Sequence, residues 1–252
     1  MFRFSEKSHM FKPHRSTIVL ILVMIFAFSV LIIVSKFAYT PSPAEETFGI
    51  DNWIFLHIFE ILGFLALVLS IIHSLRVYGR DYTLIFFPSC FLYGLILELP
   101  FDSYNQNAWL KVGPYGSMLS VVAGWCVINY ILLSISRGMS CNLSVIDRGI
   151  LCGLLGVSID IPLDPIAYAY GLWYWDGTFF GFPVITFFGV PVINFMNWFY
   201  TIFVFVVFQE YLRKSDFSPK MKFLVSLLTI PLLVMIVFLL AYTTLHLLLI
   251  MG

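Results

Sequence analysis

Ionisable side chains interrupt several otherwise apolar segments of the sequence. His57 and Glu60 are three residues apart, so they would share one face of a helix. Glu98, Asp160 and Asp164 stand near the ends of two further apolar segments. Such groups are expensive inside a membrane and commonly mark proton relays or ligand sites. Their types and positions therefore suggest chemistry that moves or donates protons.

Residues 164–189 form a second unusual feature, because they are rich in aromatic side chains and contain no Lys or Arg. The stretch includes Trp173 and Trp175. One interpretation is an aromatic belt at a membrane interface. The other is a wall for a long apolar or polyene ligand, with ring faces that stabilise a passing cation. Composition leaves both open, and the stretch is also a candidate re-entrant or interfacial helix.

The composition identifies the elements that must position these residues. Of the 252 residues, 60% are hydrophobic and only 11% are charged, and the mean hydropathy is +0.95. A soluble fold could not cover this much apolar surface, whereas a bilayer accepts an apolar exterior. The sequence therefore predicts an all-α polytopic transmembrane helix bundle. The net charge of zero implies no nucleic-acid partner.

Hydropathy predicts about seven spans in a single integral membrane domain, because a helix needs about 20 apolar residues to cross the hydrocarbon. The predicted spans cover residues 17–34, 53–75, 83–99, 115–135, 149–163, 190–212 and 223–250. The first is too long for a cleaved signal peptide and is interpreted as a retained anchor. The last is long enough to tilt, or to kink at Pro231.

Basic residues predict the orientation. If seven spans alternate, twelve of the fourteen Lys and Arg residues fall on one side of the membrane. We expect that side to be cytoplasmic, with the N-terminus inside the cell and the C-terminus outside. The polar groups of the spans, Asn194 and Asn197 included, would then share one depth in the outer third of the bilayer.

Several of these residues also have purely structural interpretations. Asn194 and Asn197 are suited to helix caps or interhelix hydrogen bonds, and His57 with Glu60 to a tie between helices. Asp164 is suited to ending a helix, and Glu98 and Asp160 lie near an interface that water can reach. The glycines of the fifth span are expected to allow close helix packing; they are Gly149, Gly153 and Gly156.

Three motifs resemble the carotenoid-biosynthesis membrane protein family, which includes carotenoid hydratases. They are DIPLDP at 160–165, GLWYW at 171–175 and GVPVINFMNW at 189–198. GLILE at 94–98 with Tyr104, and more loosely HIFE at 57–60, resemble its acid-bearing third and second spans. One departure is Asn197, where the family pattern has glycine.

The resemblance implies a hydratase that adds water to a terminal carbon–carbon double bond of a linear carotenoid. A carboxylic acid in an apolar place would protonate the alkene, and water would attack the tertiary cation. The candidate catalytic residues are Asp160, Glu98, Asp164, His57 and Glu60. The candidate substrate-binding residues are Trp173, Trp175, Asn194, Trp198 and Tyr104.

Two other functions stay open. A proton-coupled transporter would use Glu98, Asp160 and His57 as a relay, and a binding subunit would hold a carotenoid or lipid without turnover. The sequence contains no nucleotide-binding motif and no metal-ligand cluster, so no cofactor and no metal are expected. The expected partners are a long apolar isoprenoid substrate, the lipid bilayer and other carotenoid-biosynthesis enzymes.

Overall fold

A computed structural model of the chain describes residues 50–251 except 102–103, 140–141 and 180. The helices of this part are α2 (Ile50–Val77), α3 (Arg80–Glu98), α4 (Leu119–Met139), α5 (Val145–Ala169), α6 (Val192–Lys214), α7 (Pro219–Leu228) and α8 (Ile230–Met251). The predicted first span, 17–34, lies outside the described residues.

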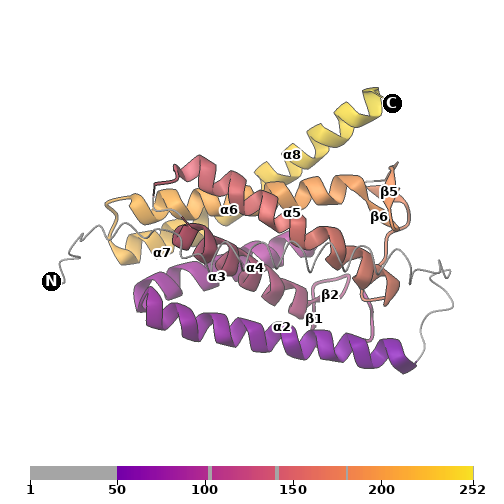
Figure 1. Ribbon diagram of the computed structural model, residues 1–252, viewed down its shortest axis with the longest axis horizontal. Helices are drawn as coiled ribbons and strands as arrows, with labels where there is room; N and C mark the ends of the chain where they lie inside the picture. The colour runs from indigo at the N-terminus through magenta and orange to yellow at the C-terminus, as the bar shows by residue number, and fades with distance from the viewer. Residues whose placement is uncertain (1–49, 102–103, 140–141, 180, 252) are drawn as a thin grey trace.

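Six of these helices, all but α7, are long and apolar enough to cross a membrane. The expected all-α polytopic bundle is therefore confirmed, and the chain is a multi-pass membrane protein. Figure 1 shows the helices running mostly along the long axis of the molecule. The short strands gather toward one end of the bundle and α7 lies at the other.

Helices α5 and α6 pack closely, and glycine makes this approach possible. A Cβ added to Gly156 would lie 2.0 Å from Cδ1 of Ile202 on α6. Gly149 and Gly153 face α6 side chains in the same way. The expected role of these glycines in close helix packing is therefore confirmed.

Polar contacts inside the bundle join α3 to α6. The Tyr93 hydroxyl donates to the Thr201 carbonyl at 2.8 Å, and the Gln209 amide donates to the Ser89 hydroxyl at 2.9 Å. Around them, buried aromatic and aliphatic side chains of α3, α4, α6 and α8 form the main hydrophobic cluster. The bundle therefore holds α3 and α6 in a defined register, which positions groups at both of its ends.

Helix α5 is longer than the predicted span 149–163, because it continues to Ala169. Pro162 and Pro165 lie inside it, and both are buried. Proline is tolerated within a membrane helix where neighbouring elements support the backbone. The expected loop at 164–189 therefore begins later, and Asp164 is a helical residue.

The remaining aromatic segment forms two hairpins among its described residues, so the candidate re-entrant or interfacial helix is not found there. Strand β3 (Thr178–Phe179) pairs with β4 (Phe182–Pro183), and β5 (Thr186–Phe187) pairs with β6 (Val190–Pro191). The turns use glycines with positive φ, such as Gly189 at 82°. A third hairpin precedes α4, in which β1 (Lys111–Val112) pairs with β2 (Ser117–Met118).

The predicted last span, 223–250, is divided in two. Helix α7 ends at Leu228 and α8 begins at Ile230, so only Thr229 separates them, and Pro231 is the second residue of α8. Proline has no N–H to continue the ladder of the preceding helix, but it is well tolerated in the first turn of a new one. The interruption thus falls where a proline kink was expected.

Candidate active site

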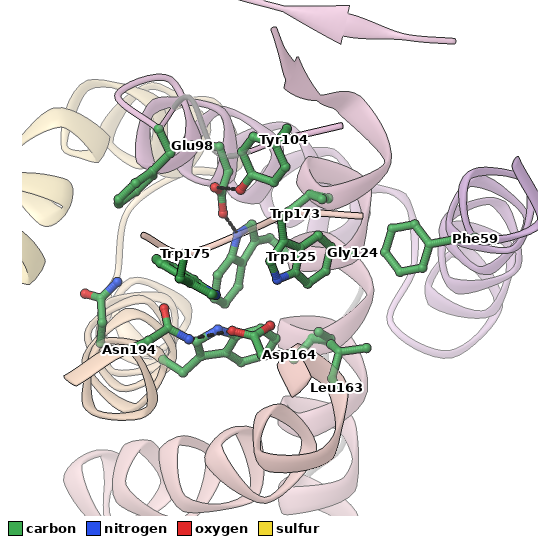
Figure 2. A pocket seen from close by; sticks show the side chains of 15 residues that line it. Phe59, Glu98, Tyr104, Gly124, Trp125, Leu163, Asp164, Trp173, Trp175 and Asn194 are labelled. Carbon is green, nitrogen blue, oxygen red and sulfur yellow. Dashed lines mark hydrogen bonds between the residues drawn. The ribbon is translucent and has the colours of Figure 1, made fainter. Parts of the chain in front are cut away.

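Helix α3 ends on a buried carboxyl group. Glu98 is its last residue and only 7% exposed. The carboxyl accepts a hydrogen bond from the Tyr104 hydroxyl on one oxygen and from the Trp125 indole N–H, at 2.5 Å, on the other. Figure 2 shows both bonds. Because both neighbours donate, this arrangement suits a carboxylate, which is an acceptor only.

Tyr104 belongs to the connection between α3 and α4 and is itself buried. Burial, together with the charge of Glu98 beside it, raises the pKa of the Tyr104 phenol well above its usual range. The phenol therefore keeps its proton at neutral pH and remains a hydrogen-bond donor to Glu98.

Helix α5 supplies two more buried carboxyl groups, one helical turn apart. Asp160 is 0% exposed and Asp164 is 3% exposed. The side-chain amide of Asn194, in the first turn of α6, donates to Asp164 Oδ2 at 2.5 Å and to Asp160 Oδ2 at 3.3 Å. The close contact between α5 and α6 thus places an amide between two acids that belong to a different helix.

A pocket of about 90 Å³ lies between these two groups of acids. Its polar lining consists of Glu98, Tyr104, Asp164, Asn194 and Asn197. Its aromatic lining consists of Phe59, Phe101, Trp125, Trp173, Trp175 and Trp198. In Figure 2, Glu98 and Tyr104 lie along one side and Asp164 with Asn194 along the other, with the tryptophans between them.

The tryptophans of the aromatic segment are held in place by backbone contacts to the α3–α4 connection. Tyr104 and Trp173 form an antiparallel bridge, and the Asn105 side chain donates to the Gly171 carbonyl at 2.8 Å. The Asn105 N–H donates to the Leu172 carbonyl at 2.9 Å. The segment after α5 therefore folds back over the pocket and carries Trp173 and Trp175 into its lining.

Three buried polar atoms at this site have no hydrogen-bond partner among the described residues. Two belong to lining residues, Trp175 Nε1 and Asn197 Oδ1, and the third is Asp160 Oδ1. Buried polar groups in folded proteins are nearly always paired, so such groups call for an explanation. A ligand that offers both a donor and an acceptor would satisfy the indole N–H and the amide oxygen together.

His57 and Glu60 lie outside the pocket lining, although Phe59 between them belongs to it. The two are paired at 2.9 Å, and Glu60 accepts the backbone N–H of Trp109 at 3.0 Å and that of Leu110 at 3.4 Å. The His57 ring also stacks on Trp109, with 3.9 Å between ring centroids. This arrangement ties α2 to the connection that carries Tyr104.

Of the ten residues that the sequence nominates, seven line the pocket; they are Glu98, Tyr104, Asp164, Trp173, Trp175, Asn194 and Trp198. Asp160 does not line the pocket itself, but it is hydrogen-bonded to the lining residue Asn194. Trp125 is the main residue that sequence reasoning misses, since a tryptophan in an apolar span carries no local signal of function. Asn197 is singled out in the sequence only by its departure from the family pattern.

Nowhere in the described part of the chain do three His, Cys, Asp or Glu side chains gather as a metal site requires.

The fold and the site define a multi-pass membrane protein with a small aromatic pocket between buried carboxyl groups. The family model for carotenoid biosynthesis proteins matches residues 55–251. The chain therefore belongs to the carotenoid biosynthesis protein family. The match covers all of the elements that form the pocket. No curated protein and no solved structure matches the chain.

Proposed function

We propose that the chain is an enzyme that hydrates a terminal carbon–carbon double bond of a linear carotenoid to a tertiary alcohol. The observation that carries this proposal is the aromatic pocket with Glu98 on one side and the Asp160–Asp164 pair on the other. Membership of a carotenoid biosynthesis family supports the substrate class.

The size of the pocket supports a reaction at the end of the substrate. Pockets that enclose a drug-sized ligand typically measure about 300 to 1,000 Å³, whereas this one measures about 90 Å³. It would accommodate the terminal isoprenoid unit, while the rest of the polyene extends toward the apolar surface of the bundle. A terminal double bond is then the bond that reaches the carboxyl groups.

The Asp160–Asp164 pair is the proposed proton donor. Both carboxyl groups are buried and share a single amide donor, Asn194, so two negative charges there would repel each other without compensation. We therefore assign one shared proton to the pair. That proton goes to the less substituted alkene carbon, the π electrons form the new C–H bond, and a tertiary cation remains on the neighbouring carbon.

The rest of the pocket lining is suited to the cation and to water. The faces of Trp125, Trp173 and Trp198 provide negative ring potential without a nucleophile that would trap the cation. A water that accepts from Trp175 Nε1 and donates to Asn197 Oδ1 would satisfy both unpaired atoms. Its oxygen bonds to the cationic carbon, and its excess proton passes to Glu98. Returning that proton to the aspartate pair completes the addition of one water.

Expression of the chain in a lycopene-producing host, with pigments analysed by mass, tests the proposal. The expected result is a product heavier by one water for each modified end, with the hydroxyl on the carbon that carries the methyl groups. Stoichiometric pigment binding without any mass change would contradict catalysis and favour a binding subunit. Substrate-dependent proton flux across sealed vesicles would favour a transporter instead.

We also propose that the α7 end of the bundle faces the cytoplasm, because the basic residues of the α6–α7 connection lie there. The pocket would then open in the outer half of the membrane. A reporter that is active only outside the cell should work when fused after Gly252 and fail when inserted at 214–220. The reverse pattern would overturn the orientation without affecting the proposed chemistry.

A further inference from the structure

A second pocket, of about 230 Å³, lies at the α7 end of the bundle, opposite the candidate active site. It is lined by the beginning of α3, the end of α6 and the beginning of α7. Arg213 and Lys222 contribute its positive charges, and Asp81 is its acid. The Lys222 ammonium is held at the rim because it donates to the Arg213 carbonyl at 2.8 Å.

The wall behind this pocket carries an excess of positive charge. Glu210 is fully buried and pairs with three guanidinium groups, at 2.5 Å for Arg137, 3.1 Å for Arg213 and 3.4 Å for Arg148. Three positive charges on one carboxylate leave a net charge of +2 in this cluster. Charge that is partly removed from water is weakly screened, so it attracts an anion from the adjoining pocket.

Two tyrosines connect the cluster to the pocket. The guanidinium carbon of Arg137 lies 5.1 Å from the ring centroid of Tyr78 and 4.9 Å from that of Tyr82, and both tyrosines line the pocket. Arg213 belongs to the cluster and to the lining at once, and its side chain is 46% exposed. Its planar guanidinium is therefore held by Glu210 on one side and available to an anion on the other.

The surroundings of the pocket are apolar, as the binding of a lipid would require. Phe217, Met221, Phe223 and Leu224 are exposed on and just before α7. They lie beside Lys222, so positive charge and apolar surface meet at the end of the membrane-spanning helices. A free anion needs only the charges, whereas a phospholipid uses both features.

We propose that this pocket binds the phosphate headgroup of an anionic phospholipid, whose acyl chains lie against the apolar side chains around α7. The phosphate would contact Arg213 and Lys222, and the net charge of the Glu210 cluster would favour an anionic lipid over a zwitterionic one. This proposal is independent of the chemistry assigned to the first pocket.

The test measures lipid retention by the full-length protein, purified in detergent and titrated with phosphatidylglycerol or phosphatidylcholine under native mass spectrometry. We expect tighter binding of phosphatidylglycerol, and at least a tenfold loss in the Arg213→Gln, Lys222→Gln double variant. The matched control is Lys214→Gln with Lys220→Gln, which removes the same charge from two exposed residues of the same region that do not line the pocket. We expect its affinity to stay within about twofold of the unaltered protein, because exposed charges that make no phosphate contact are screened by solvent and contribute little.

An equal loss in both double variants would show diffuse attraction by the whole basic surface and would overturn the site. Equal retention of the two lipids would overturn the charge argument. Displacement of phosphatidylglycerol by inorganic phosphate at a similar concentration would reassign the pocket to a free anion. Because Arg213 also bonds Glu210, the single variant Lys222→Gln is measured in parallel, and unchanged phosphatidylglycerol binding in it would contradict the proposed contact.

Discussion

The two ends of the bundle each contain buried acids, and the acids differ in their partners and not in their burial. Asp160 and Glu210 are both fully buried. Glu210 is surrounded by three arginines. Among the contacts that the structure describes, Glu98 is bonded by a phenol and an indole, and Asp160 and Asp164 are bonded by the Asn194 amide and by each other, with no arginine or lysine beside them.

This difference separates a structural acid from one that is suited to chemistry. A carboxylate held by several guanidinium groups is committed to its charged form and has little freedom to exchange a proton. Carboxyl groups without a guanidinium or ammonium partner can exist in either form. Burial alone would therefore have grouped these four acids together with Glu60, which is also buried. The identity of their neighbours divides them.

The strongest test of this comparison uses isosteric amides at the pocket. We expect Asp160→Asn and Glu98→Gln each to lower product formation by at least about 100-fold, because general acid–base assistance is typically worth about 10²- to 10⁴-fold. Product is measured by pigment analysis and divided by protein abundance. Asp147→Asn, on the exposed first turn of α5, is the matched control and should leave turnover unchanged.

Near-normal turnover in both amide variants would remove these two carboxyl groups from the mechanism. Asp160→Leu tests whether Asp160 has a structural role. If Asp160 serves only in packing, this substitution should lower the protein level more than the activity per molecule. An assay without a matching abundance measurement would not distinguish these outcomes.

The second test alters the acid at the other end. Glu210→Gln should destabilise the protein by about 3 to 5 kcal/mol, because removing one partner of a buried ion pair leaves uncompensated charge. The measurement is thermal unfolding in detergent together with the amount of protein in the membrane. The turnover of the protein that does fold should stay close to normal. Loss of turnover at full stability would contradict the structural role of this cluster.

The third test concerns Tyr104, which holds Glu98. Tyr104→Phe removes a hydrogen bond to a carboxylate, and we expect a loss of about 1.5 to 3 kcal/mol in the free energy of unfolding. Because the pKa of the folded phenol is raised, its contribution is fully present below the unfolded pKa of about 10 and is lost as the pH rises above it. The free energy of unfolding, measured from pH 7 to 11, should therefore fall less steeply with pH in the variant than in the unaltered protein. Identical alkaline slopes would contradict a buried, protonated Tyr104.

The smallest expected effect concerns the helix pair that joins the two ends. Gly156→Ala should cost about 1 to 3 kcal/mol, because its Cβ would meet Ile202 Cδ1 at 2.0 Å. Gly138→Ala is the control, since nothing lies within 4 Å of an added Cβ there. Equal stability of the two variants would show that α5 and α6 separate easily, and the position of Asn194 between the aspartates would then be poorly defined.

The sequence alone determined the class of fold, the family and seven of the fifteen residues that line the pocket. Hydropathy over about 20 residues identifies a membrane helix, because satisfying the backbone in hydrocarbon leaves few alternatives. Acids in such segments stand out for the same energetic reason, which is why Glu98, Asp160 and Asp164 were identified. The family motif at 189–198 also identified Asn194 and Trp198 as candidate site residues from the sequence alone.

The tertiary structure decided which polar groups meet. Similar depth in the membrane does not specify which helix face a residue occupies or which helices are neighbours, and therefore His57 and Glu60 were grouped with a pocket that they do not line. Trp125 is identified as a site residue only by the tertiary structure, because α4 packs beside the end of α3 and places the Trp125 indole against Glu98. The continuation of α5 through two prolines likewise depends on neighbouring helices, since local propensity alone would end the helix there.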